Sequence, residues 1–242
     1  MTDLHTHILP GMDDGSRNVE MSLAMLRAEG AQGIDRVVFT PHFYRDIENI
    51  PSFLHRRDKA LDELKRTIDA LSGEEREKLP AWTLGAEVAW VQGVGDWSEL
   101  RELCYEGTKY LLLEPPMQQW NEAFFNDVYN MLNRGITPVI AHIDRYCGTQ
   151  KRDALERLYE FGLPTQISAE PFLHMMSKGR MFRCMERSGA RLLISDCHDT
   201  DYRPPNLGSA MTVFRKKYGA DAEAFFDETD ELLMPAQWLT DE

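Results

Sequence analysis

The chain has 242 residues, of which 27 are basic and 40 acidic, so its formal net charge is −13. A surface with this charge repels phosphate, which argues against broad binding to nucleic acid or anionic lipid and leaves open only a local basic pocket. The four cysteines, Cys104, Cys147, Cys184 and Cys197, form no CxxC pair, which argues against a zinc ribbon or a dense disulfide framework and favours reduced thiols in the cytosol.

Short apolar runs alternate along the chain with longer stretches of helical periodicity. The predicted strands are 1–4, 36–40, 82–86, 110–114, 138–142, 165–168 and 191–195. The predicted helices are 19–31, 51–72, 97–105, 120–133, 152–161 and 172–188. Glycines, which favour helix ends, follow several of these segments, at Gly33, Gly107, Gly135, Gly162 and Gly189.

Most of the predicted strands are rich in Val, Ile and Leu and do not alternate with polar residues, as expected for strands buried on both faces. Seven strand–helix units predict a single α/β domain over residues 1–242, built as a parallel (β/α) barrel. An open doubly wound sheet is the competing architecture, because periodicity does not separate the two.

Six of the seven predicted strands deliver a histidine or a carboxylate at or just beyond the carboxyl end, the rim where barrel active sites are built. Residues two apart in a strand face the same way, so the pair His5 and His7 and the pair Asp196 and His198 each project together. The candidate metal ligands are His5, His7, Asp14, His42, Glu87, Glu114, His142, Asp196 and His198.

Each of these residues alone has an ordinary structural explanation, such as a core histidine, a helix cap or a turn. Together they need a common partner, because an apolar strand that ends in a buried acid or imidazole carries a desolvation cost. Imidazole and carboxylate ligands without thiolate favour Mn, Fe, Zn or Mg. His55 and His174 lie inside predicted helices, and we assign them to surface or core packing.

The motifs resemble those of the polymerase-and-histidinol-phosphatase (PHP) family. The resemblance covers nearly the whole chain and rests on segments 3–7, 14–15, 40–42, 85–87, 137–142 and 195–198 together with Glu114. Within that family, segments 142–146 and 203–205 are similar to the CpsB/CapC-type manganese-dependent protein-tyrosine phosphatases of bacterial capsule and exopolysaccharide loci.

The resemblance implies a distorted, TIM-like seven-stranded barrel that holds three divalent metal ions, with manganese expected and Fe, Zn or Mg as alternatives. Carried over by position, the first ion is held by His5, His7, Glu87 and Asp196, the second by Glu87, Glu114 and His142, and the third by Asp14, His42 and His198. Asp144 stands where the family commonly has a glutamate that is not a ligand. The implied partner is a phosphotyrosyl protein, in particular a cognate bacterial tyrosine kinase, with no nucleic acid.

For the chemistry, we expect a metal-activated hydroxide to attack the phosphorus of a phosphomonoester in line. Arg145 and Arg203 are the expected clamp on the phosphoryl oxygens, because a guanidinium group offers a forked set of donors. A phenolate leaving group needs little acid assistance, so no general acid is assigned. The aromatic residues of segment 43–45 could offer a surface to a phenyl ring, although buried packing explains them as well.

Cys197 and Arg203 match the C-x5-R pattern of cysteine-dependent tyrosine phosphatases. The five intervening residues include no glycine and two carboxylates, which repel phosphate and raise the pKa of a thiol. Cys197 also alternates with Asp196 and His198 and should point away from them. We therefore interpret the match as chance.

Four other functions are compatible with such a metal site. They are a histidinol-phosphate-type small-molecule phosphatase, a phosphodiesterase such as an exonuclease, an amidohydrolase and a metal-stabilised binding module without turnover. The acidic chain disfavours the exonuclease, and no lysine ends a predicted strand, as an amidohydrolase usually needs. No signal peptide precedes Asp3, and no apolar run approaches the roughly 20 residues that span a bilayer, so we expect a cytoplasmic protein.

Overall fold

The computed structural model describes residues 1–222, so the acidic segment 227–231 and the apolar residues 232–234 lie outside the described residues. All strand pairs are parallel. The strands are β1 Thr2–Thr6, β2 Arg36–Phe39, β3 His42–Phe43, β4 Ala81–Leu84, β5 Glu87–Ala89, β6 Tyr110–Glu114, β7 Thr137–Ile140, β8 Gln166–Ser168 and β9 Leu192–Ile194.

Strand pairing returns to its starting point, as in a barrel. β1 pairs with β2 and β2 with β4, while β3 pairs with β5, β5 with β6, and β6 with β7. Single bridges complete the circle: Ile140 to Thr165 joins β7 to the β8 segment, β8 pairs with β9, and Thr6 to Cys197 joins β1 to the residues after β9. The closed pairing excludes the open doubly wound sheet and supports the predicted distorted barrel.

Two predicted strands are interrupted and then resume. Thr40 and Pro41 separate β2 from β3, and Gly85 and Ala86 separate β4 from β5. Proline has no backbone N–H, but the carbonyl of Pro41 accepts the N–H of Glu87 at 3.0 Å, so pairing resumes on the far side of the break. The breaks distort the barrel where His42 and Glu87 begin the resumed strands.

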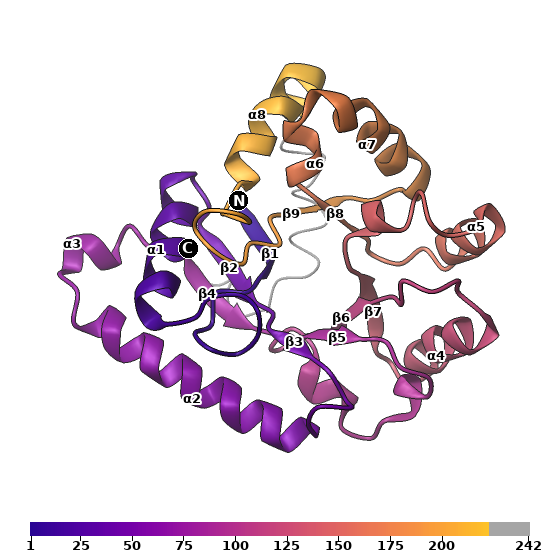
Figure 1. The fold of residues 1–242 in the computed structure, drawn as a ribbon, viewed down its shortest axis with the longest axis horizontal. Helices are drawn as coiled ribbons and strands as arrows, with labels where there is room; N and C mark the ends of the chain where they lie inside the picture. The colour runs from indigo at the N-terminus through magenta and orange to yellow at the C-terminus, as the bar shows by residue number, and fades with distance from the viewer. Residues whose placement is uncertain (223–242) are drawn as a thin grey trace.

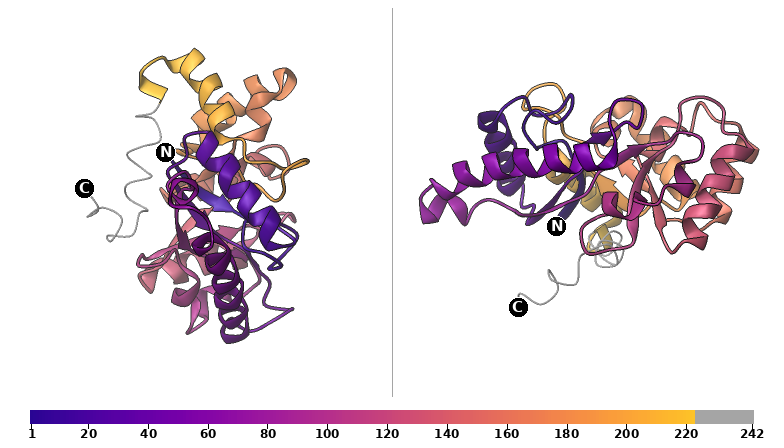
Figure 2. Two further views of the ribbon diagram at one scale, coloured as in Figure 1. Left: turned by 90° about the vertical axis from the view of Figure 1, so that its left-hand side faces the viewer. Right: turned by 90° about the horizontal axis from the view of Figure 1, so that it is seen from below.

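Helices surround the strands, and Figure 1 shows them as an outer ring. In the right-hand view of Figure 2, the long purple α2 and the rose-coloured α4 and α5 lie on opposite sides of the strands. The α-helices are α1 Val19–Ala31, α2 Ile50–Asp69, α3 Gly73–Arg76, α4 Glu122–Asn133, α5 Arg152–Glu160, α6 Glu170–Leu173, α7 Met175–Ser188 and α8 Leu207–Tyr218. None of the described helices is both long enough and apolar enough to cross a bilayer.

Most predicted helices are confirmed, and α1 has the predicted bounds. The helix predicted at 97–105 is wrong, because that range holds only the short 3-10 turn η2 Leu100–Leu103, which follows a first 3-10 turn, η1 Val94–Asp96. The helix predicted at 172–188 is divided at His174, whose extended backbone ends α6 and precedes α7. The third 3-10 turn, η3 Ile143–Arg145, follows β7 directly.

The strands are buried on both faces, as their composition predicts. The barrel interior holds a separate apolar cluster with side chains from five of the strands, β1, β2, β6, β7 and β9. Its members are Leu4, Val38, Leu112, Val139, Leu192 and Ile194 with Tyr105, Tyr110 and Ala141. A larger cluster fills the layer between the strands and the helices. Burial of this kind holds the strand ends rigidly, so side chains at the rim have well-defined positions.

The prediction of reduced thiols is wrong for two of the four cysteines. Cys147, just beyond η3, forms a disulfide with Cys184 of α7, 37 residues away in sequence. A pair so far apart leaves no motif in the sequence, and only the packing of η3 against α7 brings the two thiols together. Cys104 and Cys197 are unpaired and buried.

Candidate metal centre

All nine candidate ligands gather at one rim of the barrel. β1 carries His5 and ends next to His7, β3 and β5 begin with His42 and Glu87, and β6 ends with Glu114. His142 follows β7, and Asp196 and His198 follow β9. We call these residues, together with Asp14 from the loop after β1, the metal centre.

Glu87 is the middle of the centre and is fully buried. Its Oε2 lies 3.1 Å from His5 Nε2, 3.3 Å from His7 Nε2 and 2.9 Å from His42 Nδ1. Its Oε1 lies 2.8 Å from His142 Nε2. One carboxylate therefore faces four imidazoles that come from three different parts of the barrel.

The remaining candidates extend the cluster on two sides. Asp14 Oδ1 lies 3.5 Å from His42 Nε2 and 3.4 Å from His198 Nε2. Glu114 Oε1 lies 3.7 Å from His142 Nε2. Three sets of donor atoms are compact enough to surround one cation each: His7, Asp14, His42 and His198; His5, His7 and Glu87; and His42, Glu87 and Glu114.

These sets differ slightly from the distribution carried over by resemblance. His7 reaches the set of Asp14, and His42 takes the place expected for His142 beside Glu114. Asp196 stays close to the first set, since its Oδ1 lies 3.6 Å from His5 Nε2 and 3.5 Å from His7 Nε2.

The donor atoms of the centre are better arranged to bind metal ions than to form hydrogen bonds with one another. Four buried atoms of the centre have no hydrogen-bond partner among the described residues: Glu87 Oε2, His42 Nδ1, His142 Nδ1 and His198 Nε2. Imidazole nitrogens lie 2.9–3.3 Å from Glu87 Oε2, but none of them has hydrogen-bond geometry. Buried polar groups without partners are costly, and cations placed among these lone pairs remove that cost.

Backbone strain marks two of the strand ends. His142 has φ 28° and Asp196 has φ 55°, and both residues carry a side chain that this region disfavours. They are the only described residues other than glycine with positive φ. Strain of this kind persists where the surroundings impose it and is concentrated at functional sites.

A second layer of polar groups orients the histidines. Asp13 Oδ2 lies 2.7 Å from His7 Nδ1 and also accepts the backbone N–H of His42 at 2.9 Å. Gln166 Oε1 lies 2.9 Å from His5 Nδ1, and its amide donates to the Tyr105 hydroxyl. Such partners fix the tautomer and the ring orientation of a metal-binding histidine.

Sequence patterns do not single out either of these supporting residues. A turn is enough to explain Asp13, although its place beside Asp14 is a signal that points to the centre. Gln166 lies on the strand that delivers no histidine or carboxylate, so a search for ligand-type residues passes over it.

Gly15 allows the loop after β1 to press against His7. A Cβ at this position would lie 2.3 Å from the His7 carbonyl oxygen and 2.5 Å from the His7 Cβ, which no real side chain tolerates. The N–H of Gly15 donates to Asp13 Oδ1 at 2.9 Å, and Ser16 donates to the His7 carbonyl at 2.9 Å. The loop therefore holds Asp13 and Asp14 in place by close backbone packing.

Without metal, the cluster is a buried ionic network. Burial opposes charge on His5 and His7, yet neighbouring carboxylates raise the pKa of both: chiefly Glu87 for His5 and Asp13 for His7. Burial likewise opposes charge on Glu87 and Asp196, but the histidines hold the pKa of both carboxyls below the usual range. The pKa of His198 falls to about 4 because of burial and the nearby His7.

Arg145 and Arg203 converge on the edge of the centre. The Nη2 atoms of both guanidinium groups donate to Asp196 Oδ2, at 2.5 Å from Arg145 and 2.7 Å from Arg203. Arg145 Nη1 also lies 3.7 Å from Glu114 Oε1. The two side chains are 36% and 40% exposed, so they reach from the centre to solvent.

The C-x5-R pattern does not form a phosphate-binding loop. Cys197 is fully buried, its thiol donates to Glu29 Oε1 at 3.6 Å, and burial raises the pKa of the thiol well above its ordinary value. The Asp199 carboxylate accepts the backbone N–H groups of residues 201, 202 and 203. These N–H groups are thus already bonded to a carboxylate and are not free to bind a phosphoryl group.

The two aromatic residues after His42 have different environments. Phe43 is buried and packs edge-on against Phe53 and Trp97, which is core packing. Tyr44 is partly exposed, and its ring centroid lies 5.2 Å from that of His42. Away from the centre, His55 is exposed, and His174 pairs with Glu170 at 2.6 Å.

Comparison with known proteins places this arrangement among bacterial relatives. The model of the family described as "Capsular polysaccharide synthesis, CpsB/CapC" matches residues 1–233. The tyrosine-protein phosphatase CpsB of Streptococcus pneumoniae is 28% identical, and the alignment covers 97% of this chain and 98% of that protein. The tyrosine-protein phosphatase YwqE of Bacillus subtilis is 28% identical, with 99% and 93% covered.

A solved structure shows the same fold. It is one of the crystal structures of YwqE from Bacillus subtilis and CpsB from Streptococcus pneumoniae, which are described there as metal-dependent tyrosine phosphatases. The TM-score is 0.78 at 26% sequence identity, and the match covers 96% of this chain and 94% of the solved one.

Proposed function

The chain belongs to the CpsB/CapC family of capsular polysaccharide synthesis, and on that premise we propose that it is a metal-dependent phosphatase that hydrolyses phosphotyrosine in proteins. The observation that carries the proposal is the buried cluster of imidazole and carboxylate donors around Glu87, which leaves four donor atoms without a hydrogen-bond partner among the described residues. The relatives named tyrosine-protein phosphatases align along nearly the whole chain.

We propose that the centre holds three divalent ions, with manganese as the expected ion. The ligands are His5, His7, Asp14, His42, Glu87, Glu114, His142, Asp196 and His198, with Glu87 shared between ions. Divalent ions bound there lower the pKa of water toward neutrality and neutralise charge on phosphoryl oxygens. Asp13 and Gln166 contribute by holding His7 and His5 in the orientation for binding.

Arg145 and Arg203 bind the phosphoryl group in this proposal. Both guanidinium groups already point at one carboxylate oxygen, and both remain partly exposed to solvent. A phosphoryl oxygen has the charge and the acceptor geometry of that carboxylate, so the same two donor sets can hold it. The arginines thereby orient the phosphorus toward the centre.

An open rim favours a protein substrate over a small molecule. The Asp14 side chain is 68% exposed although its oxygen reaches His42 and His198, so the centre meets solvent directly. A tyrosyl side chain extends far enough from a peptide backbone to enter such a site. The partly exposed Tyr44 ring beside His42 offers an aromatic face to the phenyl ring.

The decisive assay compares substrates on the metal-loaded protein. A phosphotyrosyl peptide, a phosphoseryl peptide and histidinol phosphate are each incubated with and without EDTA. We expect turnover selective for phosphotyrosine that EDTA abolishes and Mn²⁺ restores. Activity that resists EDTA and is lost on thiol alkylation contradicts the metal centre, and a preference for histidinol phosphate contradicts the protein substrate.

Membership of the family supports a proposal about the physiological substrate. We propose that the substrate is the cognate bacterial tyrosine kinase of capsule or exopolysaccharide synthesis and that the enzyme meets it in the cytoplasm. Deletion of the gene should raise phosphotyrosine on that kinase, and complementation with an inactive variant should leave it raised. Unchanged phosphorylation would argue for another substrate.

A further inference from the structure

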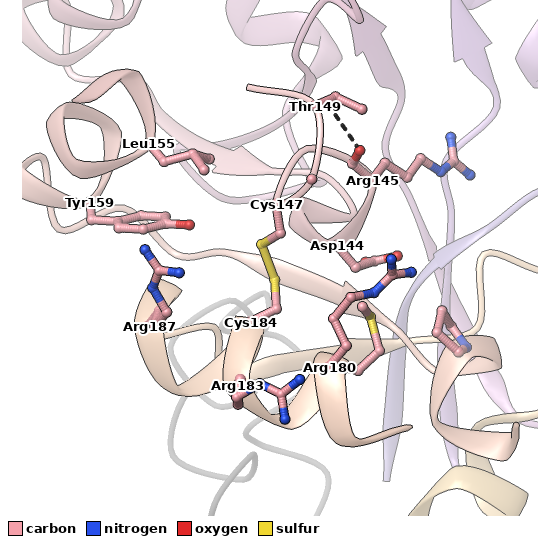
Figure 3. A pocket seen from close by; sticks show the side chains of 13 residues that line it. Asp144, Arg145, Cys147, Thr149, Leu155, Tyr159, Arg180, Arg183, Cys184 and Arg187 are labelled. Atoms are coloured by element: carbon pink, nitrogen blue, oxygen red, sulfur yellow. Dashed lines mark hydrogen bonds between the residues drawn. A yellow bond between two sulfur atoms is a disulfide. The ribbon is translucent and has the colours of Figure 1, made fainter. Parts of the chain in front are cut away.

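A cavity beside the metal centre is lined by several arginines, which is unusual in so acidic a chain. It has a volume of about 530 Å³ and lies between η3, α5 and α7 (Figure 3). Four of its lining residues are Arg145, Arg180, Arg183 and Arg187, and Asp144 is the one carboxylate among the described residues that line it. We call it the arginine cavity.

Three of the arginines come from one face of α7. Positions 180, 183 and 187 are separated by three and four residues, which places them on the same side of a helix. Cys184 lies on this side too, and its disulfide to Cys147 fixes the face against the end of η3. In Figure 3, the guanidinium groups of Arg180 and Arg187 lie on either side of the disulfide.

These positive charges have no acidic partner in the described structure. Within residues 1–222, no carboxylate oxygen lies within ion-pair distance of Arg180, Arg183 or Arg187. The one carboxylate of α7, Glu186, pairs instead with Lys217 of α8 at 3.3 Å. The two arginines of α5, in contrast, pair with glutamates: Arg152 with Glu156 and Arg157 with Glu122. Like charges on one helix face repel one another, and an anionic ligand bound there would relieve that repulsion.

Arg145 connects the cavity to the metal centre. A smaller cavity of about 200 Å³ is lined by Arg145, Asp196 and Arg203. The two cavities share Asp144, Arg145 and Pro171 in their walls. A chain bound at the metal centre can therefore extend past Arg145 along a continuous wall into the arginine cavity.

We propose that the arginine cavity binds a second anionic side chain of the phosphotyrosyl substrate, a carboxylate or a further phosphoryl group that flanks the phosphotyrosine. This inference rests on the proposed function, because it assigns the phosphotyrosine to the metal centre. The occupant is part of the same peptide, since the cavity opens beside the clamp residue Arg145. Its chemistry follows from charge: several guanidinium donors select planar carboxylate or phosphoryl oxygens.

The test measures substrate selectivity. Three phosphotyrosyl peptides are compared that differ only in flanking residues: neutral, glutamate-rich, or with a second phosphotyrosine. We expect the wild-type enzyme to prefer both anionic peptides over the neutral one in kcat/KM by roughly tenfold, with the preference falling as salt is raised. The better of the two anionic peptides identifies the source of the anion.

The informative variant is Arg183→Gln/Arg187→Gln. Both side chains are exposed, so their loss leaves the core intact. The anionic-to-neutral ratio of kcat/KM should fall about tenfold, toward one. Lys65→Gln/Arg66→Gln, which removes two exposed positive charges from α2, is the matched control and should keep the wild-type ratio. An equal fall in the control, or an unchanged ratio in the cavity variant, overturns the inference.

A binding measurement separates this inference from the proposed function. Fluorescence anisotropy with labelled glutamate-rich and neutral peptides that carry no phosphate needs no turnover. Tighter binding of the glutamate-rich peptide that Arg183→Gln/Arg187→Gln removes supports the arginine cavity even if every phosphotyrosyl peptide remains uncleaved, which would contradict only the phosphatase. Equal binding of the two peptides overturns the cavity while leaving catalysis standing.

Discussion

The metal centre and the arginine cavity are neighbouring charged regions built in opposite ways. In the centre, most charges of both signs are buried at strand ends, and each carboxylate has an imidazole beside it. In the cavity, charges of one sign stand exposed on a helix face. Buried charge demands ligands of fixed geometry, whereas exposed charge tolerates varied ones. The first design suits chemistry at one phosphorus atom, and the second suits selection among flanking sequences.

The comparison predicts that changes in the centre affect every substrate and changes in the cavity affect only selectivity. Glu87→Gln should have the largest effect, since it removes the charge that faces four imidazoles. We expect kcat/KM for p-nitrophenyl phosphate and for all peptides to fall at least about a thousandfold, together with the bound metal content. Metal analysis of the purified variant and steady-state assays measure both. Full metal content with normal turnover in this variant would contradict the prediction that the metal centre is needed for turnover of every substrate.

Arg145 belongs to both the metal centre and the arginine cavity, so its replacement tests whether it acts in catalysis, in substrate selection or in both. Arg145→Gln removes a donor to Asp196 and one wall of the arginine cavity. We expect about a hundredfold loss of kcat on every substrate and, in addition, a reduced preference for anionic peptides. Parallel assays with the neutral and glutamate-rich peptides separate the two effects. A loss of selectivity alone would move Arg145 out of the catalytic role.

Asp13→Asn tests the support behind the ligands. The carboxylate lies 2.7 Å from His7 Nδ1, so its loss leaves the imidazole without a charged partner and lowers its basicity. We expect metal affinity to fall roughly 10- to 100-fold, with activity restored by excess metal. Isothermal titration with Mn²⁺ gives the affinity. Asp35→Asn on the protein surface serves as the control, and equal affinities in both variants would exclude a supporting role for Asp13.

The pH dependence of metal binding should reveal the network of the centre. Carboxylates raise the pKa of His5 and His7, so these histidines hold protons to a higher pH than usual, and metal binding must release the protons. Affinity is therefore greatest above the raised pKa values and falls as pH decreases through them, by about tenfold for each proton and pH unit. Mn²⁺ titrations between about pH 8 and 6 measure the slope. A flat profile would contradict the ionic network.

Cys197→Ser should have the smallest effect on activity. It tests whether a buried residue next to the candidate ligands can be changed without loss of turnover. Cys197 is fully buried and lies between Asp196 and His198 in sequence, yet its thiol contacts Glu29 in the layer outside the barrel. We expect activity within about twofold of wild type, because hydroxyl and thiol are close in size. A severe loss in a variant that is still folded by circular dichroism would revive the covalent mechanism.

Strand ends were the most predictable part of the molecule. Apolar runs that stop at His, Asp or Glu located the rim, and the structure gathers all nine candidates there. Their grouping into compact donor sets was less predictable, because Glu87 and His42 each face several partners at nearly equal distances. Helix 207–218 was missed although Leu207, Ala210, Met211 and Phe214 are buried at helical spacing, a signal that was present in the sequence.

Features that depend on tertiary packing were not predictable from one sequence. The disulfide joins residues 37 positions apart, and the three arginines of α7 resemble any solvated helix face until η3 is packed against them. A 3-10 turn at 100–103 stands where a helix was predicted over 97–105, because the segment is short. Helical nucleation is unfavourable in so short a stretch.

The bridge between Thr6 and Cys197 has a consequence for biosynthesis. It joins β1 to the residues after β9, and candidate ligands flank it on both sides: His5 and His7 in one segment, Asp196 and His198 in the other. A nascent chain on the ribosome therefore lacks part of the metal centre until residue 198 has been made. Incomplete translation products that end before this point carry only a fragment of the centre.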